Sequence, residues 1–246
     1  MNELGTTDLP LWLTAVATAC LAVAVACAVW TAVDLTRRPQ HMAVMNLVWP
    51  ITALFGSVLW VIFYRRYGRA AEGDADGAGA PAPASDRPRW SQVAISTTHC
   101  GAGCALGDLI AEFSVAALPP LAVAVGWHRL YEQHLIAAWI WDLVLAFALG
   151  IVFQYFAIAP MRDQPRHRSL LDAVKADTLS ILSWQLGMYG SMAIIQFLIA
   201  PPLWGGMLAP TTPAFWLAMQ LAMLVGFACS YPVNALLIAR GVKEAM

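Results

Sequence analysis

The sequence predicts an all-α fold, a polytopic membrane helical bundle with six transmembrane helices and both termini in the cytoplasm. Of the 246 residues, 60% are hydrophobic and 12% are charged, and the mean hydropathy is +0.64. Soluble domains carry roughly 25% charged residues. A helix crosses about 30 Å of hydrocarbon with around 20 apolar residues, and six stretches of the chain meet this length. We therefore expect an integral membrane protein.

The predicted spans are divided by a segment that is rich in Gly, Ala, Pro and Asp. The spans lie at residues 10–33, 44–64, 97–125, 134–158, 177–199 and 215–238. The dividing segment has too few large apolar residues to offset the entropy lost on ordering it. The sequence therefore predicts three parts. They are an N-terminal transmembrane hairpin at 1–67, a flexible cytoplasmic linker at 68–92 and a four-helix membrane core domain at 93–246.

The distribution of basic residues predicts the orientation, because Lys and Arg near span ends tend to remain cytoplasmic. Eleven of the fourteen Lys and Arg residues fall in the two long loops and after the last span, whereas Arg37, Arg38 and Arg129 fall in the other loops. Both termini should then be cytoplasmic, although Arg37 and Arg38 conflict locally with this orientation. The start of the chain lacks the basic region of a signal peptide, so we expect the first helix to remain.

Ionisable side chains are concentrated in the third span, in the segment THCGAGCALGDLIAEF. Such groups are costly inside a membrane and usually mark function. Positions 100, 104, 108 and 112 are four apart and form one stripe along a helix. The stripe consists of Cys100, Cys104, Asp108 and Glu112, with His99 beside it. We therefore expect these side chains to face one cavity.

Small residues predict close helix packing beside this stripe. Gly103 and Gly107 follow the pattern that lets two membrane helices approach closely, and Gly187 has a similar place in the fifth span.

The residue types of the stripe suit a transition metal. Cys, His and carboxylate groups are ligands for Zn²⁺, and thiolates select softer ions such as Cu⁺. The predicted metal ligands are His99, Cys100, Cys104 and Asp108. Two alternatives remain open, because buried Cys is also a common small filler and a carboxyl group can be neutral and hydrogen-bonded to a neighbouring helix.

Further polar or sulfur-containing side chains in the core predict a path for protons or cations. The predicted path consists of Glu112, Asp142, Asp177, Met188 and Met192. Intramembrane carboxylates often bind cations or relay protons, although Met at helical spacing is more often core packing.

Several classes of function lack any signal in this sequence. It contains no phosphate-binding loop, dinucleotide fingerprint or nucleophile elbow, which argues against a bound nucleotide, nucleic-acid binding and hydrolase or ATPase activity. Bis-histidine haem needs two facing histidines, and His99 has no evident partner, so we expect no haem. The sequence favours a protein that is not an enzyme.

Three segments together resemble a bacterial membrane family catalogued as a domain of unknown function, number 4396. They are THCGAGCALGD, AWIWDLVLAFALGIVFQYFAIAPM and KADTLSILSWQLGMYGSM, within residues 96–192. The resemblance implies a bacterial cytoplasmic (inner) membrane protein and supports the choice of residues above. Asp108 stands where Glu is expected as often. The family has no established activity, so the resemblance implies none.

The combined expectation is a membrane protein that binds or transports a Cu- or Zn-class cation, coupled to protons through the intramembrane carboxylates. One alternative is a redox or cofactor-assembly protein that uses Cys100 and Cys104. Another is a noncatalytic helper subunit of a larger membrane complex. Expected partners are membrane lipid and either a second copy or other subunits.

Overall fold

The computed structural model describes residues 3–40, 42–70, 87–158 and 166–243. Six helices in it are long and apolar enough to cross a membrane, as the sequence predicted. The long α-helical elements of these six are α1 (Leu11–Arg37), α2 (Met45–Phe63), α3 (Arg89–Ala117), α5 (His134–Ile158), α6 (Arg166–Ala193) and α8 (Pro213–Ala239). The chain is a multi-pass membrane protein with a helical-bundle fold.

Short elements connect these helices at their ends. They are β1 (Glu3–Leu4), η1 (Thr6–Asp8), η2 (Tyr64–Gly68), α4 (Pro119–Ala124), η4 (Ile194–Ile199), α7 (Ala200–Trp204) and β2 (Met207–Leu208). The strands β1 and β2 pair in parallel and join the start of the chain to the segment before α8. Gln196 on η4 holds β2 in place, because its amide group makes two hydrogen bonds to the Leu208 backbone, of 2.8 and 3.0 Å.

Helix boundaries differ from the predicted ones near prolines and near polar residues, because some helices end at a proline and others extend into polar sequence. The third span was predicted at 97–125, but α3 ends at Ala117, because consecutive prolines at the start of α4 cannot continue its hydrogen bonding. It also begins earlier, at Arg89. The fifth span was predicted at 177–199, whereas α6 begins at Arg166. Most of the predicted linker, 71–86, lies outside the described residues.

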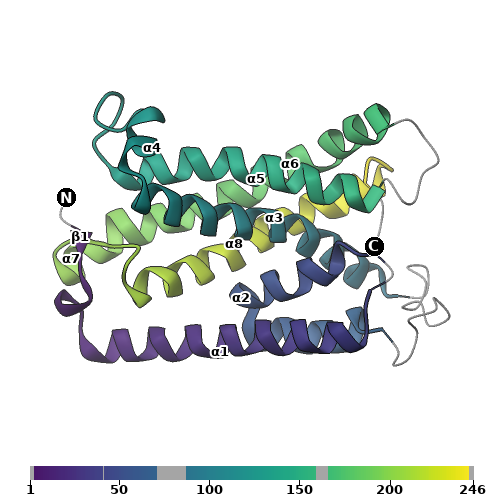
Figure 1. Ribbon diagram of the computed structural model, residues 1–246, viewed down its shortest axis with the longest axis horizontal. Helices are drawn as coiled ribbons and strands as arrows, with labels where there is room; N and C mark the ends of the chain where they lie inside the picture. Colours follow the sequence, from purple (N-terminus) through teal and green to yellow (C-terminus); the bar gives the residue numbers. More distant parts are fainter. Residues whose placement is uncertain (1–2, 41, 71–86, 159–165, 244–246) are drawn as a thin grey trace.

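The second apolar helix does not cross the bundle. Ser57 has φ 49° and ψ −134°, and this break turns α2 back on itself. Trp49, near the start of α2, packs against Tyr64 with ring centroids 5.3 Å apart, and a Cβ on Gly68 would lie 2.3 Å from the Trp49 ring. The residues before Ser57 and those after it, counted through η2, each cover at most roughly 18 Å, which is short of the hydrocarbon thickness of about 30 Å. Figure 1 shows α2 confined to the half of the bundle nearest the C-terminus, next to the end of α1.

The returning half of α2 is fixed to the end of α1. Asp34 on α1 accepts hydrogen bonds from Tyr64 Oη (2.9 Å) and from Arg69 Nε (2.9 Å), and Arg69 Nη2 lies 2.5 Å from its other oxygen. A helix that crossed the membrane would place Arg69 far from Asp34. The α1–α2 pair is therefore a full crossing followed by a re-entrant hairpin.

This hairpin affects where the two ends of the chain lie in the bundle. The five remaining apolar helices each run the length of the bundle, and an odd number of crossings places the two ends of the chain on opposite faces. The described start lies beside the segment before α8, and Lys243 lies at the other end, as Figure 1 shows. This arrangement differs from the expectation that both termini share one side, which stays a prediction, because an apolar run of this length looks like a span whether or not it bends.

The core helices pack in antiparallel pairs around α3. Gly103 on α3 lies against α5 so closely that a Cβ would be 2.8 Å from the Gly150 backbone. Gly187 on α6 lies similarly against α8, where a Cβ would be 2.8 Å from Cys229 Sγ. The three glycines that were predicted to allow close packing therefore lie at helix crossings, namely Gly103, Gly107 and Gly187.

We predict that reporters attached to the two ends of the chain will report opposite sides of the membrane. A phosphatase that is active only outside the cytoplasm and a fluorescent protein that matures only inside would test this at each terminus. A reporter within 71–86 should agree with the one at the C-terminus. Agreement between the two termini would contradict the re-entrant hairpin.

We also predict that Gly103→Ala lowers the free energy of unfolding by about 1–3 kcal/mol, because the added methyl group overpacks against rigid backbone. Thermal unfolding in detergent would measure this. The matched control is Gly190→Ala on α6, where a Cβ would meet nothing within 4 Å and stability should change little. Equal stability of the two variants would contradict the close approach of α3 and α5.

Candidate cation path

Helix α3 carries the predicted ionisable side chains into the centre of the bundle. It packs against α2, α5, α6 and α8. The five predicted residues are all at most 4% exposed, namely His99, Cys100, Cys104, Asp108 and Glu112. From His99 to Glu112 the helix rises about 20 Å, which is most of the hydrocarbon thickness. The stripe therefore runs through the bundle rather than into one small cavity.

A pair of carboxyl groups lies at the middle of this stripe. Asp108 on α3 and Asp142 on α5 are within hydrogen-bond reach of each other. Gly107 makes room for this contact, because a Cβ at that position would lie 2.9 Å from Asp142 Oδ1. The close crossing of α3 and α5 thus brings together two side chains that are 34 positions apart in the chain.

Two side chains from α6 hold the second oxygen of Asp142. Gln185 Nε2 donates a hydrogen bond to Asp142 Oδ2 at 3.0 Å, and Tyr189 Oη lies 2.6 Å from the same oxygen. Tyr189 Oη is also 2.9 Å from the carbonyl oxygen of Trp139. The carboxyl pair is therefore supported from three helices.

The hydrogen-bond count at this pair calls for one additional proton. Asp108 Oδ2 and Asp142 Oδ1 are buried and have no hydrogen-bond partner among the described residues. Two ionised carboxylates cannot hydrogen-bond to each other, since both are acceptors. A proton on the pair lets one carboxyl group donate to the other and removes the repulsion between two buried negative charges.

The two thiols of the stripe adjoin each other one helical turn before the carboxyl pair. Cys104 is within hydrogen-bond reach of Cys100, and both side chains are fully buried. All five cysteines are free. Two thiols one turn apart on one helix do not readily form a disulfide without distorting it, but they present two soft ligands to one point.

The four predicted metal ligands are spread along α3 instead of gathered. His99 and Asp108 are nine positions apart, about 14 Å along the axis. Within the described ranges, no group of three or more His, Cys, Asp or Glu side chains is close enough to hold a metal ion. The metal-ligand set stays a prediction. Met188 and Met192, from the predicted path, are fully buried in the hydrophobic core.

A buried ion pair closes the end of the stripe nearest the C-terminus. Lys243 Nζ lies 2.6 Å from Asp177 Oδ1, and both side chains are 0% exposed. Gly241, with φ +68°, turns the chain after α8 so that Lys243 reaches inward. His99 is buried near this pair, next to the Phe153 backbone, and neither ring nitrogen makes a hydrogen bond of good geometry.

Hydroxyl and amide groups extend this polar region between α6 and α8. Ser180 Oγ and Ser230 Oγ are 3.1 Å apart, and Asn234 Nδ2 donates to Ser180 Oγ at 2.7 Å. All three side chains are fully buried. They lie one to three turns from the Asp177–Lys243 pair on the same two helices.

The other end of the stripe reaches a small pocket beside β1 and β2. Its polar lining consists of Glu3, Glu112, His134 and Gln196, and its volume of about 10 Å³ is close to what one water molecule needs. Glu112 is thus the innermost carboxylate at that end. Buried ionisable groups therefore occur at intervals from Lys243 to Glu112, and the exposed Glu3 lies beyond them.

Sequence reasoning missed three residues of this arrangement. Lys243 was counted as a cytoplasmic tail residue, although it is buried. Gln185 and Tyr189 were given no role, yet they bind Asp142. Their four-residue spacing on an apolar helix was a usable signal, but the choice of partner depended on how α5 and α6 cross.

Comparison with protein families matches residues 89–243 to the domain of unknown function DUF4396. The chain belongs to the DUF4396 family. The predicted resemblance is confirmed, and the match extends beyond 96–192. The DUF4396 region begins where α3 begins and ends at Lys243, so it contains every helix of the cation path and both members of the terminal ion pair. Comparisons with curated proteins and with solved structures gave no match.

We predict that Lys243→Met alone destabilises the protein by about 3–5 kcal/mol, because it leaves Asp177 buried without its counter-charge. The double variant Lys243→Met/Asp177→Leu should recover most of this loss, since an apolar pair can replace a buried ion pair. Unfolding of both variants in detergent would measure the difference. A single variant as stable as the wild type would contradict the buried ion pair.

Proposed function

We propose that this protein carries a cation across the membrane in exchange for protons, along the stripe of ionisable side chains on α3. The observation that carries this proposal is the buried Asp108–Asp142 pair, which needs one shared proton to satisfy its hydrogen bonds. Ionisable residues inside a membrane commonly mark ion pathways and proton relays.

The chemistry follows from the charge of this pair. With one proton it carries a single negative charge inside the bundle. A monovalent cation that takes the place of the proton leaves the net charge of the pair unchanged. Binding of the cation and release of the proton are therefore coupled. Gln185 and Tyr189 hold Asp142 in place during the exchange, and Glu112 provides the next carboxylate toward the N-terminal end.

We infer that the C-terminal end faces the cytoplasm of a bacterial inner membrane and that the N-terminus lies outside. With the re-entrant hairpin, Arg37 and Arg38 lie at the same end of the bundle as the other basic residues that the structure describes, apart from Arg129 at the opposite end. This removes the local conflict in the distribution of basic residues and follows the positive-inside rule closely.

A soft metal cation is the cargo that the thiols favour. Cys100 and Cys104 adjoin each other directly before the carboxyl pair, and as thiolates, each having released its proton, they select Cu⁺ over harder ions. Two thiolates supply two ligands, which is few for Zn²⁺, whose protein sites are usually four-coordinate. We therefore propose Cu⁺ in preference to Zn²⁺ as the transported ion.

We predict that wild-type protein in liposomes dissipates an imposed pH gradient when monovalent cations for exchange, Cu⁺ among them, are supplied on the alkaline side, and that Asp108→Asn and Asp142→Asn each lower this flux at least tenfold. A pH-sensitive dye trapped in the liposomes would measure it. Glu132→Gln, at an exposed loop carboxylate, is the matched control and should retain the flux. Flux that survives both Asn substitutions would contradict the proposed path.

We predict that protein purified after growth with copper contains the metal, and that Cys100→Ser/Cys104→Ser loses it. Elemental mass spectrometry would measure the content, with Cys229→Ser, at an exposed cysteine, as the control. Equal metal in all three proteins, or none, would overturn the Cu⁺ proposal while leaving the proton flux testable. A titratable thiol couple would favour the redox alternative, and copurification with fixed partners the helper subunit.

A further inference from the structure

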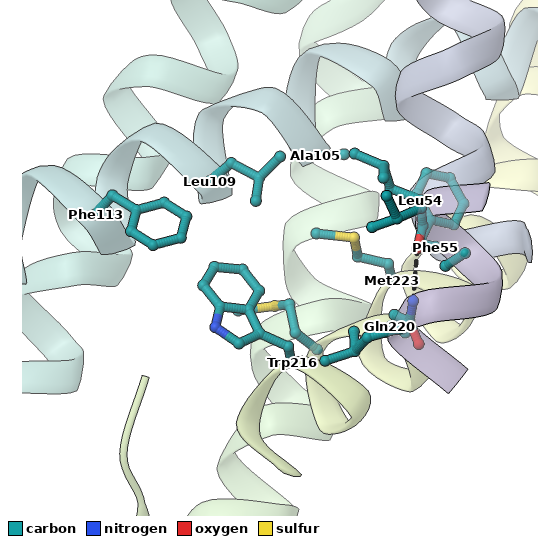
Figure 2. Close-up of a pocket in the computed structure, with 12 residues that line it drawn as sticks. Leu54, Phe55, Ala105, Leu109, Phe113, Trp216, Gln220 and Met223 are labelled. Carbon is teal, nitrogen blue, oxygen red and sulfur yellow. Dashed lines mark hydrogen bonds between the residues drawn. The ribbon is translucent and has the colours of Figure 1, made fainter. Parts of the chain in front are cut away.

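An apolar pocket lies beyond the tip of the re-entrant hairpin, between α1, α3 and α8. It has a volume of about 260 Å³, and Figure 2 shows Leu109 and Phe113 on one side and Trp216, Gln220 and Met223 on the other. Because α2 turns back at Ser57, its described residues do not extend along the half of α1 nearest the N-terminus. The pocket occupies part of the space that a full-length helix would take.

The lining of this pocket offers water few hydrogen-bond partners. Gln220 Nε2 donates to the Leu54 carbonyl oxygen at 2.6 Å and Trp216 Nε1 donates to the Pro210 carbonyl oxygen at 2.8 Å, so the side-chain polar groups that remain belong to the Gln220 amide. The other lining side chains are aliphatic, aromatic or thioether groups. A pocket of this kind excludes water and takes an apolar occupant.

The rim of the pocket faces the hydrocarbon of the membrane. Val25 on α1 and Phe113 on α3 line the pocket and are also 53% and 60% exposed on the outer surface of the bundle. Phe113 stacks on Trp216 with ring centroids 5.3 Å apart, which closes the pocket toward the N-terminal face. The opening therefore lies at the depth of lipid tails.

We propose that the pocket binds one acyl chain of a membrane phospholipid from the leaflet on the N-terminal side. A methylene group fills about as much space as a water molecule in the liquid, roughly 30 Å³, so 260 Å³ accommodates about nine methylenes. The surrounding leaflet supplies such chains continuously. An isoprenoid quinone is the competing occupant, and the test below distinguishes it from phospholipid.

The chain would complete the packing of α3 opposite the cation path. Ala105 and Leu109 line the pocket, and each directly follows a residue of the stripe, Cys104 or Asp108. The lipid therefore takes the structural place of the missing half-helix. This assignment does not depend on the proposed transport.

Native mass spectrometry of the full chain in mild detergent tests the proposal. Wild-type protein should retain one phospholipid per chain, and Ala24→Phe, which fills the pocket from α1, should retain at least tenfold less. Val29→Phe is the matched control, because Val29 is on α1, is 57% exposed and does not line the pocket. Equal retention in all three, or a bound quinone in place of phospholipid, would overturn the proposal.

A second measurement applies to the wild type, in case Ala24→Phe fails to fold. Phospholipid with a photoreactive group in its acyl chain should label Leu21, Leu54 and Leu109 several-fold more than Leu186, which is 78% exposed on α6. Labelling of the pocket residues at or below the level of Leu186, or crosslinks there to a second copy of the chain, would contradict the acyl-chain site.

Discussion

The contact between two carboxyl groups, Asp108 and Asp142, is the constraint on which the core depends. It requires α3 and α5 to cross closely, which the glycines at 103 and 107 permit. It also requires donors on a third helix, which Gln185 and Tyr189 supply from α6. A buried carboxyl pair without such support would be strongly destabilising. The same arrangement that makes the pair tolerable also fixes how three helices pack.

The bend at Ser57 determines the rest of the architecture. It converts an apolar helix into a hairpin that starts and ends beside Asp34, and so places the two ends of the chain on opposite faces. It gathers nearly all basic residues at one end of the bundle. It also leaves an apolar pocket beyond its tip. The placement of the chain ends, the position of the basic residues and the apolar pocket therefore all follow from the backbone conformation at Ser57.

Sequence patterns predicted the elements that depend on local periodicity. Six apolar helices, the ionisable stripe on α3 and the packing role of Gly103 follow from spacing and length. The bend at Ser57 could not be predicted, since hydropathy does not distinguish a crossing helix from a folded one. The burial of Lys243 depends on a turn after α8, and the partners of Asp142 depend on helix crossings. The four predicted metal ligands all lie on one helix, and the rise per residue of that helix spreads them along its axis, so they do not meet at one point.

Infrared spectroscopy of the purified protein tests the central claim, that the Asp108–Asp142 pair holds one proton. The account predicts a protonated carboxylic acid absorption at neutral pH in the wild type, which shifts or disappears in both Asp108→Asn and Asp142→Asn and persists in Glu132→Gln. A spectrum in which neither Asn variant alters that absorption, or in which the wild type has ionised carboxylates only, would contradict the shared proton and the exchange mechanism built on it.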